Sequence, residues 1–189
     1  IRVVTLAVSG LLNPAVGGPP VRPPQPAGVW EDISMGRNKY EVTDGPERHR
    51  RTLYAFWRRA AAPAFLFDVA QRRVCEVRSP RTNTPMQALA LRNDPGRLEA
   101  ARALAALETD TTGMFRRVLA RDPSPAETAV LTRELDRARG AFAPRPDDAR
   151  RYLHAAGGEM ADKGDPVAWA SRAVVAALIL NLDEAISRE

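Results

Sequence analysis

Apolar residues recur at intervals of three and four along most of the chain, the spacing typical of helices that each bury one face. Val3, Val4, Ala7 and Val8 set this pattern at the start. The same spacing continues after residue 84, and the alternation expected of strands is poor. The pattern therefore predicts an all-α fold, an irregular multi-helix bundle, with helices at 1–12, 49–60, 85–92, 95–108, 112–120, 125–142, 147–156 and 166–187.

Four of these helices are predicted to begin in the same way, with a side-chain oxygen followed directly by proline. The oxygen can accept a hydrogen bond from a backbone N–H that has no helical partner. Proline suits the first helical position because the N–H it lacks would have no partner there. Gln87 and Glu127 stand where each would complete a capping box. The four starts are Thr84-Pro85, Asp94-Pro95, Ser124-Pro125 and Asp165-Pro166.

The last predicted helix contains the longest apolar run of the chain, eight residues at 173–180. A helix that is apolar nearly all round belongs in the centre of a bundle, so we expect this helix to be central. The run is far shorter than the roughly 18 residues that a membrane crossing needs. No membrane span is predicted.

Residues 13–26 hold six of the sixteen prolines, which excludes a helix there. Proline and its effect on the preceding residue favour extended geometry, so the segment is predicted to form a Pro-rich arm. A disordered linker is the alternative, but Val21, Val29 and Trp30 supply apolar anchors that a free linker would not need. We favour an arm laid across the domain surface. The predicted organisation is then 1–48, a helix end plus the Pro/Gly-rich arm, and 49–189, the helical domain.

The composition, 44% hydrophobic and 27% charged, is that of a soluble globular protein. Only 6% of residues are aromatic, so the core is expected to consist mainly of Ala, Val and Leu. The net charge of +5 is local, because residues 48–81 contain nine arginines against Asp68 and Glu76. Such a patch could bind phosphate groups, but no nucleic-acid motif accompanies it, so nucleic-acid binding is the least favoured function.

Cys75 is the only cysteine, which excludes an intrachain disulfide, a thiolate zinc site and an attached c-type haem within this chain. A small buried apolar side chain is the favoured interpretation of Cys75 over a reactive thiol. His49 and His154 have no Glu or Cys at ligand spacing, so no metal site is predicted. The sequence therefore predicts neither a metal nor a cofactor in this chain.

The chain opens at Ile1 inside an apolar pattern, and we expect it to be part of a longer polypeptide. Arg2, the apolar run at 3–8 and the small residues near 15–18 could imitate a signal peptide. The helical spacing of the apolar residues instead favours an amphipathic helix packed on a core.

Candidate binding residues cluster on the predicted helix 49–60, where Arg50, Arg51, Tyr54 and Trp57 stand at or near helical spacing. A planar guanidinium fork beside an aromatic surface could bind an anionic or carbohydrate-like ligand. The favoured alternative is an amphipathic helix whose arginines are solvated or paired. In that alternative the core would receive Leu53, Phe56 and Trp57.

A second candidate site precedes the helix that starts after Thr84. An anion could dock at this helix N-terminus, with Arg81 and Asn83 completing the site. The favoured alternative makes Thr84 a cap and Asn83 part of a turn. The sequence contains no complete set of residues for a known reaction, so no catalytic residue is assigned and enzyme activity stays open.

Six blocks of the chain stand in an order that resembles a known family, the planctomycete-specific C-terminal domain of unknown function (domain of unknown function 1553). This domain often shares a chain with a planctomycete cytochrome c domain. The resemblance covers almost the full length, although residues 60–64 look like a proline-poorer version of the family's loop and Arg92 replaces an expected aliphatic residue. The blocks are residues 6–12, 17–26 with Trp30, 50–59, 81–89, 93–95 and 181–184.

The resemblance implies a large secreted or periplasmic multidomain protein. Some members of the family carry haem c, and the resemblance implies no established reaction. We therefore expect an accessory or structural module that docks onto upstream domains of the same polypeptide, where any haem would also lie. The first alternative is half of an enzyme active site shared with the upstream domain, to which Tyr54, Arg81 and Asn83 would contribute.

Overall fold

Helices form the regular structure of the described residues, which are 1–25, 40–56, 84–155, 157 and 164–186 of a computed structural model. Within these ranges there is no strand, and two isolated bridges join Asn13 to Arg50 and Val21 to Ala55. The prediction of an all-α fold with an extended arm is confirmed. The elements are α1 (Arg2–Val8), the 3₁₀ turns η1 (Gly45–His49) and η2 (Thr52–Tyr54), α3 (Pro85–Asn93), α4 (Pro95–Leu107), α5 (Thr111–Leu119), α6 (Pro125–Phe142), α7 (Pro146–Ala155), α8 (Pro166–Leu180) and α9 (Asp183–Ile186).

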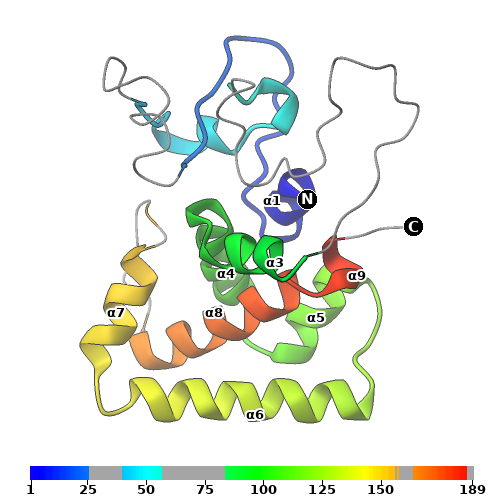
Figure 1. The fold of residues 1–189 in the computed structure, drawn as a ribbon, viewed down its shortest axis with the longest axis vertical. Coiled ribbons are helices and arrows are strands. Elements are labelled where there is room, and N and C mark those ends of the chain that lie inside the picture. Colours follow the sequence, from blue (N-terminus) through cyan, green and yellow to red (C-terminus); the bar gives the residue numbers. More distant parts are fainter. Residues whose placement is uncertain (26–39, 57–83, 156, 158–163, 187–189) are drawn as a thin grey trace.

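Helix α8 is the centre of the bundle, as its apolar sequence predicted. It contacts α4, α5, α6 and α7, and Figure 1 shows it running between α4 and the long outer helix α6. Its residues are buried on more than one side, with Ala170, Val175 and Ile179 each fully inaccessible to solvent. The other helices therefore assemble around α8.

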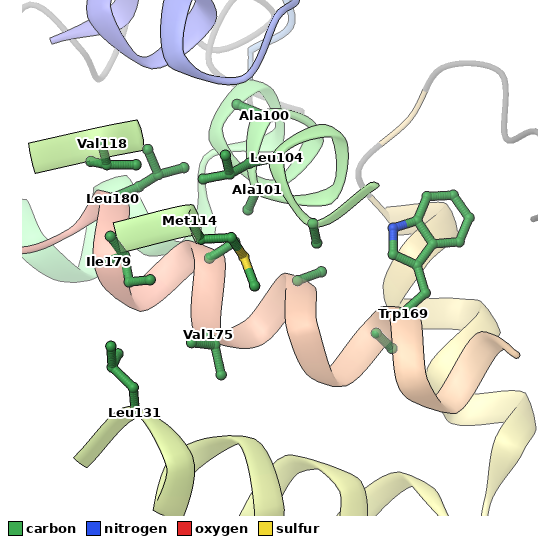
Figure 2. Packing of buried hydrophobic residues seen from close by; sticks show 14 of the residues in the cluster. Ala100, Ala101, Leu104, Met114, Val118, Leu131, Trp169, Val175, Ile179 and Leu180 are labelled. Atoms are coloured by element: carbon green, nitrogen blue, oxygen red, sulfur yellow. The ribbon is translucent and has the colours of Figure 1, made fainter. Parts of the chain in front are cut away.

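The core contains mainly small aliphatic side chains, as the low aromatic content indicated. Figure 2 shows Leu104 of α4, Met114 of α5 and Leu131 of α6 gathered around the α8 residues Val175 and Ile179. Alanines occupy much of the buried surface of both α4 and α8. Because alanine has no side chain beyond Cβ, the two helix backbones can approach closely.

All four predicted oxygen-proline starts cap their helices. Thr84 and Ser124 form complete capping boxes with Gln87 and Glu127, as predicted. Asp94 accepts a hydrogen bond from the backbone N–H of Arg97 at 3.0 Å, and Asp165 accepts from two backbone N–H groups of α8. A fifth cap, Asp110 at the start of α5, was missed because no proline follows it.

The predicted helix 49–60 is wrong over its described part, residues 49–56. These residues form the end of η1, an extended stretch at Arg50 and Arg51, and the single turn η2. Their backbone groups bond to the arm: Val21 N–H donates to the Tyr54 carbonyl at 2.8 Å, and Phe56 N–H donates to the Val21 carbonyl at 2.7 Å. Pairing with the arm replaced the intrahelical bonds that the spacing predicted, and residues 57–60 lie outside the described residues.

Two other helices are shorter than predicted. The first ends at Val8, because Gly10 adopts a left-handed conformation (φ 72°) that lets Leu11 N–H and Leu12 N–H bond back to the Leu6 carbonyl. The last ends at Leu180, where the Asn181 side chain donates to the Ala88 carbonyl of α3, and a separate turn, α9, follows. The remaining bounds differ from the predictions by a residue or two.

The described part of the arm, residues 13–25, lies along residues 50–56 and is not a disordered linker. Val21 is 3% exposed and Pro23 is fully buried, so the arm has the apolar anchoring that its sequence suggested. Val29 and Trp30 lie outside the described residues. Helix α1 packs on α4, and the predicted division of the chain between residues 48 and 49 stays a prediction.

A helix that crosses a bilayer must be both long and apolar. Among the described helices, none combines the length and the apolar character that a bilayer crossing requires.

The Asp165 cap gives a test of the bundle's central helix. We expect Asp165→Ala to lower the free energy of unfolding by about 1 kcal/mol, because two N–H groups at the start of α8 lose their acceptor. Asp165→Asn, which keeps an acceptor oxygen, should retain most of the stability. Urea denaturation of both variants measures this, and equal losses in the two would contradict the capping role.

Candidate functional site: a charged pocket between α1, the arm and α4

A pocket lies where α1, the arm, η1 and the start of α4 meet. Its cavity volume is about 30 Å³, roughly twice the minimum needed to hold one water molecule. Five of its twelve lining residues have charged side chains, and His49 is a sixth ionisable one. The lining residues are Ile1, Arg2, Thr5 and Leu6 of the first segment, Pro23 and Pro24 of the arm, Arg48 and His49 of η1, and Asp94, Gly96, Arg97 and Glu99 at the start of α4.

Arg97 joins three separate parts of the chain at the base of this pocket. It is only 7% exposed, because it stands four and seven residues before the buried Ala101 and Leu104, on the same face of α4. Its guanidinium donates to the Thr5 hydroxyl of α1 at 3.3 Å and to the Leu180 carbonyl at the end of α8. Burial lowers the pKa of Arg97 to about 10, so it stays protonated at neutral pH.

Glu99 ties η1 to α4. One carboxylate oxygen accepts a hydrogen bond from Arg48, and the other lies 3.2 Å from His49 Nε2. Burial alone would raise the pKa of Glu99, but the hydrogen bond and charge of His49 and the charge of Arg48 outweigh burial and lower the pKa. The Glu99 carboxylate is therefore held ionised by its two partners.

Arg2 fixes the other side of η1. Its guanidinium donates to the main-chain carbonyls of Arg48 and Arg50, each at 2.6 Å. Burial lowers the pKa of Arg2 to about 10, so this group also keeps its charge at neutral pH.

Asp94 is the second carboxylate of the pocket. It is 7% exposed, and burial raises its pKa although the nearby Arg97 acts in the opposite direction. One oxygen is occupied in capping α4. Before His49 and the amino group of Ile1 are counted, the pocket contains three guanidinium groups and two carboxylates, which leaves one positive charge in excess.

Two of the predicted binding residues, Arg50 and Tyr54, are brought together beneath the arm. Arg50 is 2% exposed, and its guanidinium donates to the arm carbonyls of Ala15 (3.4 Å), Gly17 and Pro19 (3.0 Å). The guanidinium also lies 4.1 Å from the centre of the Tyr54 ring, and the Tyr54 hydroxyl accepts from Gly17 N–H at 2.9 Å. In this arrangement the arm occupies the donors that were proposed for a ligand.

The other predicted residues are not brought into this cluster. Arg51 is exposed. Leu53 is 86% exposed, so its predicted place in the core is wrong. Trp57, Arg81 and Asn83 lie outside the described residues, and a ligand at these positions stays a prediction.

The basic patch at 48–81 is described only at its start. There Arg48 pairs with Glu99 and Arg50 bonds to the arm, which leaves Arg51 as the arginine of this described part that faces solvent. The described part of the patch therefore adds little to the nucleic-acid hypothesis.

The pocket was not predicted, although the sequence contains one signal for it. Arg97 interrupts the apolar face of a strongly predicted helix, and a charged residue at such a position needs a buried partner. The identity of its partners, Thr5 and Leu180, could not be inferred because they are 92 and 83 residues away in sequence. Within the described ranges, no group of three or more His, Cys, Asp or Glu side chains could hold a metal ion.

Comparison with known families assigns the chain. The family model PSD1, described as a protein of unknown function (DUF1553), matches residues 1–135. The chain belongs to the PSD1 family. The match confirms the resemblance to this family over residues 1–135, which include every residue that lines the pocket, while the block at 181–184 lies beyond the matched residues. No curated protein and no solved structure matches the chain.

The hydrogen bonds of Arg50 predict that a lysine at this position would lower the stability of the fold. Arg50→Lys keeps the charge but loses the fork that reaches several carbonyls, so we expect the free energy of unfolding to fall by about 2 kcal/mol. Limited proteolysis should also cut the arm faster. The matched control is the exposed neighbour, Arg51→Lys, which should change stability by less than about 0.5 kcal/mol. Equal effects of the two substitutions would contradict the role of Arg50.

The pairing of Glu99 with Arg48 and His49 predicts that the stability of the fold decreases at acidic pH. Its pKa is lower in the folded state than its ordinary value of 4.5, so its contribution is complete above about pH 4.5 and is lost as pH falls through the folded pKa. We expect Glu99→Gln to be less stable than the wild type at pH 7 and closer to it at pH 3. Thermal unfolding of both proteins across this range measures the difference, which should not be constant.

Proposed function

We propose that this PSD1 chain is a non-catalytic accessory module of a larger secreted or periplasmic multidomain protein. The observation that carries the proposal is the internal engagement of the groups in the pocket that could transfer protons. Glu99 bonds to Arg48 and lies against His49, and Asp94 caps α4. A general acid or base needs to reach a substrate, and these groups already have partners in the fold.

The guanidinium groups of the pocket support the same proposal. Arginine presents five N–H donors and stays protonated in proteins, so it can bind a ligand without exchanging protons with it. A pocket whose acids are paired and whose excess charge belongs to arginine is suited to binding.

The docking surface in this proposal is the outer face of the arm and η2. Arg50 holds the arm carbonyls from the inside, and Val16 and Leu53 are left 78% and 86% exposed on adjoining segments. Because the arm and η2 are already anchored, docking through these two side chains would not have to order the segments first. The upstream domains of the same polypeptide are the proposed partner, because the family resemblance implies a multidomain chain. Any haem c would lie in those domains.

One observation favours a second function, half of an active site shared with an upstream domain. Burial raises the pKa of Asp94 in a pocket lined by cations, and perturbed carboxyl groups in pockets are typical of catalytic sites. In this alternative a substrate would reach Asp94 from the side that the upstream domain covers.

The docking proposal is tested in the natural full-length polypeptide with Leu53→Asp. We expect faster hydrogen exchange of residues 13–25 and 50–56 in this variant, because a buried charge would oppose docking. Val130→Asp is the matched control, since Val130 is 46% exposed on the outer helix α6 and should leave exchange unchanged. Unaltered exchange in Leu53→Asp would reject this docking surface.

The compartment is tested separately by fractionating cells that make the natural polypeptide. The proposal expects the protein outside the cytoplasmic membrane, where added protease reaches it in spheroplasts. Recovery in the cytoplasmic fraction alone would reject a secreted or periplasmic location.

A further inference from the structure

We propose that the pocket between α1, the arm and α4 binds a small monoanionic carboxylate. The inference goes beyond the accessory role and does not depend on the docking surface at Leu53. It rests on the charge of the pocket, on unused guanidinium donors and on the character of its walls.

The excess positive charge of the pocket favours an anionic ligand. Arg2, Arg48 and Arg97 face the two carboxylates of Asp94 and Glu99, so a monoanion would balance these five groups when His49 is neutral and the amino group of Ile1 is left out of the count. On the same count, a dianion such as sulfate or phosphate would reverse the sign of the pocket. Because the flanking charges are mostly buried, an imbalance there is weakly screened by solvent and salt.

Arg48 and Arg97 have donors to spare. Together they have ten N–H groups, and within the described residues they donate to Glu99 from Arg48 and to Thr5 and Leu180 from Arg97, while Arg48 Nε lies 3.3 Å from His49 Nε2. A carboxylate is planar and accepts two parallel N–H bonds from one guanidinium, which makes it the anion best matched to such groups. Chloride and other spherical ions cannot use this geometry.

The walls and the size of the pocket limit which group can be attached to the carboxylate. Leu6, Pro23 and Pro24 offer carbon atoms to an alkyl group attached to the carboxylate. The cavity volume of about 30 Å³ restricts the ligand to a few non-hydrogen atoms. A group the size of acetate meets these conditions, either as a free acid or as a carboxylate of a partner chain.

The test measures binding of acetate to the complete chain by calorimetry and thermal unfolding at constant ionic strength. We expect acetate to raise the unfolding temperature in a saturable manner, whereas acetamide, chloride and sulfate should not. Arg48→Lys keeps the charge but not the fork, and should weaken acetate binding at least tenfold. The control Arg133→Gln, on the exposed face of α6, should bind acetate as the wild type does.

The outcomes separate the sources of the carboxylate. If a dipeptide with a free C-terminus binds and its amide does not, the ligand is a carboxylate of a partner chain; if acetate alone binds, it is a free small acid. The proposal is overturned if acetate has no effect, if sulfate or chloride acts equally, or if Arg48→Lys binds as well as wild type while its melting temperature shows it to be folded. Calorimetry on Leu53→Asp should still detect acetate, so failure of the docking proposal is distinguishable.

Discussion

Hydrogen bonds from arginine side chains to main-chain carbonyls hold the segments of this protein together. Carbonyls at helix ends and in the Pro-rich arm have no regular backbone partner. One guanidinium can satisfy several of them at once, which a lysine ammonium on a flexible stem does less well. Only Lys39 and Lys163 among the 28 basic residues are lysines, and this predominance of arginine therefore has a structural use here. These bonds run from Arg2 to residues 48 and 50, Arg50 to 15, 17 and 19, Arg97 to 180, Arg102 to 153 and 157, and Arg117 to 8.

The pocket is a product of the same interactions. The guanidinium groups of Arg2 and Arg97 are buried where they donate to main-chain carbonyls. Buried positive charges need carboxylates nearby, and Glu99 and Asp94 provide them. Hence a cluster with the residue types of an active site arises from the need to fasten α1, η1 and α4. The two carboxylates are engaged within the fold, whereas Arg48 and Arg97 retain donors beyond their described hydrogen bonds, so binding is better supported than catalysis.

Local signals in the sequence predicted the bundle well. Caps such as Ser124 and Asp165 act within three residues, and the apolar run of α8 fixes its central place, so neither depends on distant partners. The stretch at 49–56 could not be predicted in this way. Its helical spacing was overridden by the arm, whose backbone bonds to Tyr54 and Phe56 from some 30 residues earlier in the sequence. The pocket was hidden for the same reason, since its residues come from four separate segments.

The contacts of Arg97 have a consequence for synthesis of the chain. Its guanidinium links Thr5 near one end of the sequence to Leu180 near the other. A ribosome releases the chain from its N-terminus, and domains form as their residues emerge. The base of the pocket thus stays incomplete until residue 180 has left the exit tunnel, well after the stretch that matches the family model has been made. Until then, the Arg97 guanidinium lacks the Leu180 carbonyl that accepts one of its hydrogen bonds.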